Sequence, residues 1–265
     1  MRRVIDFHAH MGDIFTGRNV SFRTGLPRPE DLEDCFAEND RGGFPYTAQG
    51  KPAEELQGRM AAGQNRLKYA SYENIGKTLD REGGVCSVLL PINPHTTFDE
   101  YLAASRLDSR LIPFTNPDFS RPQKDMMDKL RADIRNGAKG LKLHPVIQNV
   151  SLLDPRTLEA VELFGEAGLP ILSHVGQSNY YVREQEAEYP ITIEFGTIDY
   201  FVELAHKYPD YDMVAAHCGR NFPSRLAEMT EGLEHVYTDT TFAGAPQIRE
   251  VTEKLGVDKV LFGTD

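Results

Sequence analysis

The sequence has no long hydrophobic run and no export signal at its start. A membrane-spanning helix needs about 20 consecutive apolar residues, and no segment of the 265 residues approaches that length. The apolar stretch that follows Arg3 is much shorter than the core of a signal peptide. We therefore expect neither a membrane protein nor an exported one.

Cysteine is scarce, and basic residues are outnumbered. The three cysteines, Cys35, Cys86 and Cys218, show no paired spacing, which argues against a disulfide framework and favours a reducing compartment. The sequence has 29 basic and 40 acidic residues, which gives a net charge of -11. This negative charge disfavours binding to nucleic acid or anionic lipid. We expect a cytoplasmic protein that acts on a small molecule, and a homo-oligomer is left open.

A glycine-rich dinucleotide fingerprint is also missing. The first apolar segment leads into His-Ala-His-Met-Gly, not G-x-G-x-x-G, which counts against an open doubly wound sheet. Short apolar segments instead alternate with segments of helical period, which predicts one α/β domain over residues 1–265, a (β/α)8 barrel of the TIM type. The predicted strands are Arg3–His8, Val85–Ile92, Leu111–Thr115, Gly140–His144, Pro170–His174, Met213–His217, Val236–Thr240 and Lys259–Gly263. Predicted helices include Asp125–Asn136, Pro155–Ala167, Gly196–Lys207, Phe222–Glu231 and Ala245–Leu255.

Two features depart from a minimal barrel. Residues 13–53 form an insertion after the first strand, with one short helix expected near Pro29–Glu38. Long loops at this position usually shape the active site, so a lid or substrate wall and a surface or oligomer contact are both open. The sequence also stops at Asp265, directly after the eighth predicted strand. We expect either a truncated chain or an edge that another element covers.

Histidines gather at one edge of the predicted barrel. Five of the eight come at the carboxyl ends of predicted strands, namely His8, His10, His144, His174 and His217. That edge is where catalytic groups converge in such barrels. His8 and His10 are two apart and share a strand face, so both imidazoles can bind one ion. Imidazole together with carboxylate suits zinc, and a catalytic site keeps one position open for water.

The segments IDFHAH, GLKLHP, ILSHVG, AAHCG and LFGTD together resemble the amidohydrolase superfamily, in order from Ile5 to Asp265. They are most similar to the branch that includes aminocarboxymuconate-semialdehyde decarboxylase. The resemblance implies one divalent ion, with zinc favoured and two ions as an alternative. It implies His8, His10, His174 and Asp265 as metal ligands, and His217 and Asp265 as catalytic groups that handle protons of the metal-bound water.

Three further residues are candidates for substrate binding. Other branches of the superfamily carbamylate a lysine on the fourth strand to bridge two metals, and Lys142 has that position. We expect instead that Lys142 or His144 binds a substrate anion, although His144 is equally compatible with a pocket wall. Arg220 is suited to a bidentate contact with a substrate carboxylate, or else to the surface or an interface. Asp239, late in its strand, is expected to support a ligand histidine.

Three functions remain open at this point. The leading hypothesis is metal-dependent hydrolysis of a small amide, lactone or related carboxyl compound. The alternative is metal-dependent, non-oxidative decarboxylation of a small unsaturated or aromatic acid, which needs a cation near the leaving carboxylate. A catalytically inactive barrel is the third. The ligand set does not separate hydrolysis from decarboxylation, because the pocket decides between them.

Overall fold

The strands in the computed structural model agree with the sequence prediction. The structure describes residues 4–27, 52–220 and 222–265. All eight predicted strands are present: β1 Val4–Ala9, β2 Val85–Leu89, β3 Leu111–Pro113, β4 Leu141–Leu143, β5 Ile171–Ser173, β6 Met213–Ala215, β7 Val236–Asp239 and β8 Val260–Leu261. Several are shorter than predicted, because the chain leaves the strand before the terminal histidine. His144, His174 and His217 therefore lie just beyond their strands.

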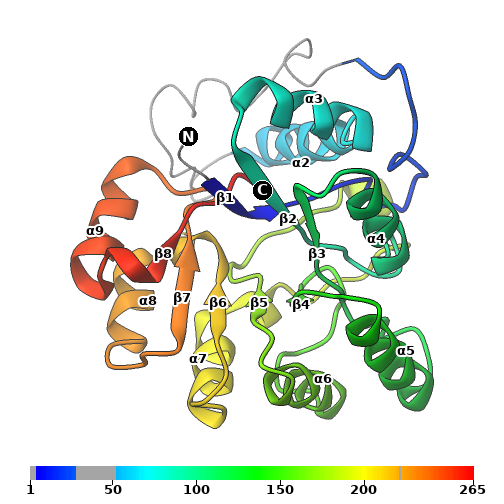
Figure 1. Cartoon of the computed structure of the whole chain (residues 1–265). Helices are drawn as coiled ribbons and strands as arrows, with labels where there is room; N and C mark the ends of the chain where they lie inside the picture. The colour runs from blue at the N-terminus through cyan, green and yellow to red at the C-terminus, as the bar shows by residue number, and fades with distance from the viewer. Residues whose placement is uncertain (1–3, 28–51, 221) are drawn as a thin grey trace.

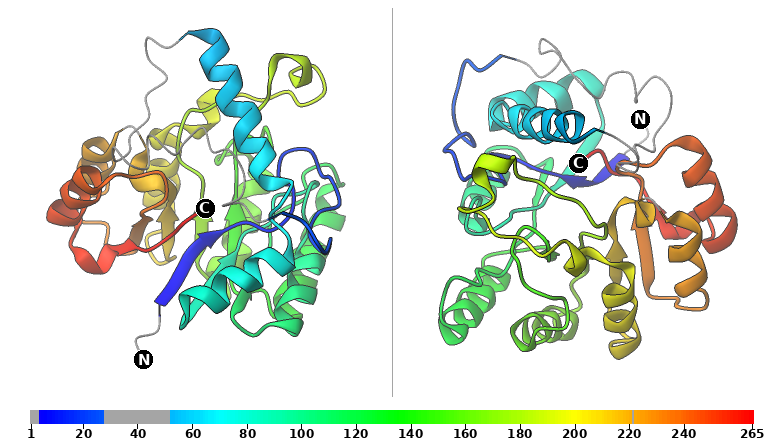
Figure 2. Two further views of the ribbon diagram at one scale, coloured as in Figure 1. Left: turned by 90° about the horizontal axis from the view of Figure 1, so that it is seen from above. Right: turned by 180° about the vertical axis from the view of Figure 1, so that it is seen from behind.

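The strands pair in parallel in the order β1-β2-β3 and β4-β5-β6-β7-β8. Isolated backbone contacts join these two sheets at both seams. Thr115 pairs with Leu141 between β3 and β4. At the other seam Phe7 N donates to Phe262 O at 2.7 Å, and Asp265 N donates to His8 O at 2.7 Å. The C-terminus therefore lies beside β1, as Figures 1 and 2 show. The fold is an α/β barrel.

Helices follow the strands and lie on the outside (Figure 1). They are α2 Ala53–Leu67, α3 Tyr72–Glu82, α4 Phe98–Leu107, α5 Gln123–Arg135, α6 Pro155–Glu166, α7 Ile198–Lys207, α8 Pro223–Met229 and α9 Ala245–Leu255. Short 3-10 turns are η2 Arg183–Gln185, η3 Ile193–Gly196, η4 Ala216–Gly219 and η5 Val257–Lys259. In the described part of the chain, no helix combines the length and apolarity that crossing a membrane requires.

Apolar packing holds the site on a rigid base. Inside the barrel, inward side chains of several strands form one cluster: Val88, Leu90, Phe114, Leu172, Val214 and Ala216. A larger cluster packs α5, α6 and α7 against the outer face of the strands, with Leu130, Phe164 and Phe201 fully buried or nearly so. Closely packed interiors resist displacement, so the strand ends above them are held in place.

The predicted insertion is only partly described. The helix expected near Pro29–Glu38 lies outside the described residues. Residues 13–27 follow β1 without helix or strand. Asp13 organises their start, since its side chain accepts from Phe15 N and Thr16 N at 3.0 Å each. Tyr181 OH also donates to Phe15 O at 3.0 Å, which ties this segment to the loop after β5.

Candidate metal centre

One pocket collects the histidines at the carboxyl ends of the strands. It encloses about 340 Å³ of empty space, part of which is open to solvent. The lining residues are His8, His10, Ile14, Phe15, Lys142, His144, His174, Tyr180, His217, Phe242 and Asp265. All predicted metal ligands, both predicted catalytic residues, Lys142 and His144 are among them. Arg220 is not.

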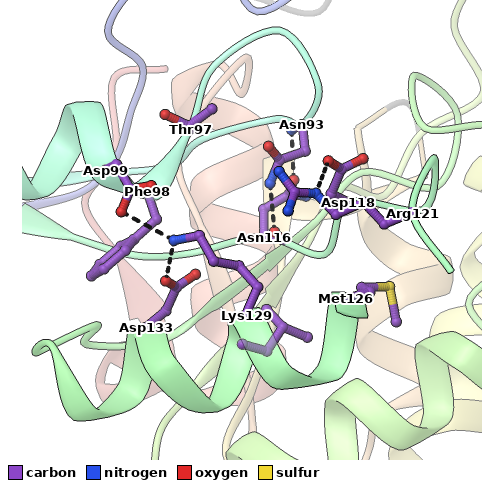
Figure 3. Close-up of a pocket in the computed structure, with 11 residues that line it drawn as sticks. Asn93, Thr97, Phe98, Asp99, Asn116, Asp118, Arg121, Met126, Lys129 and Asp133 are labelled. Atoms are coloured by element: carbon purple, nitrogen blue, oxygen red, sulfur yellow. Dashed lines mark hydrogen bonds and ion pairs between the residues drawn. The ribbon is translucent and has the colours of Figure 1, made fainter. Parts of the chain in front are cut away.

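A second hollow of about 380 Å³ lies beside α4 and α5 (Figure 3). Its charged side chains pair with one another. Lys129 Nζ lies 3.0 Å from Asp99 and 2.5 Å from Asp133, and Arg121 Nε donates to Asp118 at 2.8 Å. No histidine lines this hollow. It therefore lacks the donor set of a transition-metal site.

His8 has a defined tautomer in the pocket. Its Nδ1 lies 2.8 Å from Asp239 Oδ2, and an ionised carboxylate only accepts hydrogen bonds, so Nδ1 carries the proton. The Nε2 atom then has a free lone pair, which accepts from Lys142 Nζ at 3.1 Å. The same Nε2 lies 3.8 Å from Asp265 Oδ1. Asp239, which was expected to support a ligand histidine, therefore contacts His8.

His10 is oriented in the same way by a backbone group. Its Nδ1 lies 2.6 Å from Leu90 O, and a carbonyl oxygen only accepts, so Nδ1 is the donor. Its Nε2 lies 3.2 Å from Asp265 Oδ1. Burial lowers the pKa of His10, although the nearby Asp265 opposes this. The neutral ring therefore presents a lone pair to the carboxylate.

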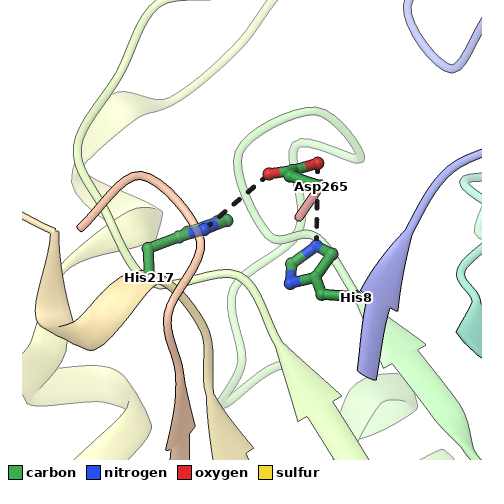
Figure 4. Close-up of side chains that lie close together, drawn as sticks. All are labelled: His8, His217 and Asp265. Carbon is green, nitrogen blue, oxygen red and sulfur yellow. Dashed lines mark ion pairs between the residues drawn. The ribbon is translucent and has the colours of Figure 1, made fainter. Parts of the chain in front are cut away.

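Asp265 is the point where these groups converge. Burial raises the pKa of its carboxyl group, but the neighbouring His8, His10 and Lys142 together outweigh burial, and the net pKa lies below the usual range. Ligand atoms of His8, His217 and Asp265 all lie within 4.8 Å of one another, and Figure 4 shows Asp265 between the two rings. Imidazole lone pairs facing an ionised carboxylate are suited to a divalent cation. The residues therefore fit a metal ion.

The chain reaches His217 through a left-handed turn rather than along a strand. The prediction that β6 extends to His217 is wrong, because β6 ends at Ala215 and His217 and Cys218 have φ of 70° and 48°. Such angles cost energy in residues other than glycine. The His217 N–H donates to Asp239 Oδ1 at 3.0 Å, which offsets part of this cost. His217 Nδ1 lies 2.5 Å from Thr241 Oγ1 and 3.8 Å from Asp265 Oδ2.

His174 follows β5 and was predicted as the third histidine ligand, but its ring contacts residues other than Asp265. Its Nδ1 lies 2.8 Å from His217 Nε2, and its Nε2 lies 2.9 Å from Gly176 O and 2.8 Å from the Tyr180 hydroxyl. The ring of His144 stacks on it, with centroids 4.1 Å apart. His174 thus lies against His217 rather than against Asp265. Its role as a ligand stays a prediction, and His144 forms a wall beside it.

Two basic residues lie close to this group. Lys142 is completely buried, and burial lowers the pKa of its amine to about 8, while the negative charges of Asp265 and Asp239 oppose the shift. The Arg220 guanidinium lies over the Phe242 ring, 4.9 Å from its centroid. Burial and, beside it, the charge of Arg220 lower the pKa values of His174 and His217, so Arg220 lies near the pocket although it does not line it.

Several pocket residues were not predicted from the sequence. Ile14 and Phe15 come from the segment after β1, and Phe242 from the loop after β7. Thr241 contacts both His217 and Asp239. Thr241 and Phe242 directly follow the predicted strand Val236–Thr240 at the edge where the pocket lies, and this position was the available signal. Cys218 is fully buried and does not line the pocket, which argues against a role as nucleophile, and burial also raises the pKa of its thiol to about 12.

Comparisons with known proteins identify the family and the fold. A family model described as amidohydrolase matches residues 5–265. The chain has no significant match among curated proteins. An uncharacterised TIM-barrel protein from Bordetella bronchiseptica has a TM-score of 0.66 at 13% identity, covering 99% of this chain and 85% of that chain.

Two neighbours have named activities. A dihydroxybenzoic acid decarboxylase from Polaromonas, with bound manganese and the inhibitor 2-nitroresorcinol, has a TM-score of 0.62 at 12% identity, with 100% of this chain and 86% of that chain covered. A 4-oxalomesaconate hydratase from Rhodopseudomonas palustris has a TM-score of 0.56 at 17% identity, with 98% and 80% covered. At these identities the likeness shows the fold alone. The match of the family model over nearly all of the sequence, which confirms the resemblance of its motifs, shows that the chain belongs to the amidohydrolase family.

Proposed function

We propose that this protein is a metal-dependent hydrolase of a small amide, lactone or related carboxyl compound. The observation that carries the proposal is the ionised Asp265 carboxylate, which faces the imidazoles of His8, His10 and His217 at one pocket. A carboxylate that is ionised at neutral pH has lone pairs that can accept a proton. Hydrolysis requires such an acceptor close to the attacking water.

His8, His10, His174 and Asp265 would hold one divalent ion; His8 and His10 face Asp265, and His174 lies beside them against His217. A divalent ion bound there polarises a substrate carbonyl and lowers the pKa of water. Zinc suits the mixed imidazole and carboxylate donors best. Manganese, which the Polaromonas decarboxylase contains, is the second metal to test, and two ions remain an alternative if Lys142 is carbamylated.

The protein residues supply the proton transfers and the binding surface. Asp265 accepts the proton that the attacking water loses, and His217 Nδ1, 3.8 Å from Asp265 Oδ2, passes a proton on to the leaving group. The side chains of Phe15, Tyr180 and Phe242 exclude bulk water from the pocket. Lys142 holds an anionic group of the substrate.

Non-oxidative decarboxylation is the second candidate, and the Lys142 environment favours it. The Lys142 amine donates to His8 rather than to a carboxylate, so its charge is available to a leaving carboxylate. Flat rings of Phe15, Tyr180 and Phe242 line the same pocket, which suits a planar unsaturated or aromatic acid. In this reaction the bond from carbon to the carboxylate breaks, carbon dioxide leaves, and a proton is delivered to the carbon.

The two reactions are distinguished by their products. The protein, loaded separately with zinc and with manganese, is incubated with a panel of lactones, small amides, and unsaturated or aromatic acids. Hydrolysis of a lactone releases acid, which a pH-stat measures, whereas decarboxylation releases carbon dioxide, which a coupled assay measures. Acid release that disappears in Asp265→Asn supports the proposal. Carbon dioxide release alone would replace it with the second candidate, and inactivity with every substrate in a metal-loaded protein would favour an inactive barrel.

The cellular setting is part of the same proposal. The net charge of -11 and the three unpaired-looking cysteines of the sequence support a cytoplasmic protein with a small, carboxylate-bearing substrate and no nucleic-acid or membrane partner. A homo-oligomer is compatible with this proposal.

A further inference from the structure

Asp239 is a fully buried carboxylate at the end of β7. It does not face the pocket directly, since it is absent from the lining residues. Its two oxygens instead contact residues of two different elements that do. Burying a carboxylate is costly unless its oxygens accept hydrogen bonds, so the partners of Asp239 indicate what its burial achieves.

One oxygen of Asp239 accepts a hydrogen bond from a residue of β1. Asp239 Oδ2 accepts from His8 Nδ1 at 2.8 Å. This hydrogen bond keeps the His8 proton on Nδ1 and leaves the Nε2 lone pair free toward Asp265 and Lys142. A histidine can bind a metal only through an unprotonated nitrogen, so this tautomer is the one that metal binding through Nε2 requires.

The other oxygen of Asp239 accepts hydrogen bonds that hold the turn at His217. Asp239 Oδ1 accepts from the His217 N–H at 3.0 Å and from the Thr241 N–H at 3.1 Å, and it contacts the Thr241 hydroxyl. The turn that it holds contains consecutive left-handed residues, His217 and Cys218. Left-handed residues other than glycine persist only where surrounding contacts hold them.

We propose, building on the proposed metal-dependent function, that Asp239 is a positioning residue that determines both the His8 tautomer and the geometry of the His217 turn. A single carboxylate thereby couples a metal ligand on β1 to the catalytic histidine that follows β6. Hydrogen-bond partners of metal ligands are worth about 10- to 100-fold in metal affinity. Loss of the Asp239 charge therefore has a defined consequence for metal binding.

The Asp239→Asn variant keeps one side-chain oxygen and replaces the other with an NH2 group. The backbone donors of His217 and Thr241 cannot change, so the single amide oxygen must face them. The amide NH2 then faces His8 Nδ1, which has to become an acceptor, and the ring proton moves to Nε2. We expect metal-free Asp239→Asn to hold His8 as the Nε2–H tautomer. We also expect its dissociation constant for Zn²⁺ to rise about 10- to 100-fold.

The tautomer is read from the nitrogen-15 shifts of the histidine rings by NMR, and His8→Gln assigns the signals. Zinc affinity is read by competition with a chromophoric chelator. Asp133→Asn is the matched control, because Asp133 is equally buried and accepts from Thr115 Oγ1 and Lys129 Nζ in α5, away from the pocket. It should leave the His8 tautomer and the zinc affinity unchanged.

Two results would overturn the inference. One is an Asp239→Asn variant with the wild-type tautomer and wild-type affinity. The other is an Nε2–H tautomer of His8 in the metal-free wild-type protein, which needs no variant to fold. A wild-type protein that binds no divalent ion would refute the proposed function, while the tautomer measurement would still decide the role of Asp239.

Discussion

Lys142→Met tests the electrostatics of the metal-free site. The Lys142 amine is completely buried, and burial lowers its pKa from 10.5 to about 8. The unfolded chain, in contrast, keeps the ordinary value. The difference corresponds to about 3 kcal/mol of destabilisation while the amine is charged in both states. Methionine has a similar shape without the charge, so the variant removes this cost.

The net effect at pH 7 is smaller, because the variant also loses a hydrogen bond. Lys142 Nζ donates to His8 Nε2 at 3.1 Å, and removing the donor costs about 1 kcal/mol. We therefore expect metal-free Lys142→Met to be about 2 kcal/mol more stable than the wild type at pH 7. Between pH 8 and 10.5 the unfolded chain binds the lysine proton and the folded chain does not. Wild-type stability consequently rises relative to the variant, and the advantage of the variant disappears.

The assay is urea unfolding of both proteins in chelator at pH 7 and at pH 10, and the quantity compared is the difference in the free energy of unfolding. Contributions from other titrating groups cancel in that difference. A Lys142→Met variant that is no more stable than the wild type at pH 7 would refute the predicted gain in the free energy of unfolding. A difference that stays constant between the two pH values would refute the low pKa itself.

Three further predictions concern the same fold and site. Lys142→Met should bind Zn²⁺ more tightly than the wild type in a chelator competition, because Lys142 no longer competes for His8 Nε2, whereas weaker binding would indicate a carbamylated, metal-binding lysine. Gly196→Ala should lower the free energy of unfolding by about 1–3 kcal/mol, since its Cβ would meet a carbonyl oxygen of the loop after β5. Gly58→Ala, in open space on α2, is the control and should not be destabilised; equal urea midpoints for both variants would contradict this packing. Cys218, whose thiol pKa is raised to about 12 by burial, should resist iodoacetamide at pH 8 in the native protein and react after unfolding, as peptide mass spectrometry measures; rapid native labelling would contradict its burial.

The strand order could be predicted from the sequence because each buried strand has its own apolar run. The segment Met213–Ala215 is an example, since all three residues are buried on a parallel sheet. The predicted start of the helix at Pro155 is confirmed. Asp154 accepts from Arg156 N at the start of α6, where Pro155 is the first residue.

The geometry beyond the strand ends could not be predicted in the same way. Strand alternation describes residues that remain in the ladder, whereas the chain leaves β6 before His217 and turns through left-handed residues. No local pattern marks that turn, because the contact that holds it comes from Asp239, 22 residues later. The position of His174 against His217 likewise depends on a contact between side chains 43 residues apart.

The convergence of His8, His10 and Asp265 could be predicted, because it depends only on the strand pattern and the strand order. Two residues on one strand face and one residue after the neighbouring strand meet in any closed parallel arrangement. In the structure, the hydrogen bond from Asp265 N to His8 O places Asp265 beside the first strand. The role of these residues as ligands stays a prediction until metal binding is measured.

The most direct test of the account is the metal content of the purified protein, measured by elemental analysis beside two variants. The first is the double variant His8→Ala/His10→Ala, and the second is His206→Ala, an exposed histidine of α7. We predict about one equivalent of zinc or another divalent transition metal in the wild type and in His206→Ala, and its loss in the double variant. A wild-type protein that holds no such ion after zinc is supplied, or a double variant that retains it, would contradict the account.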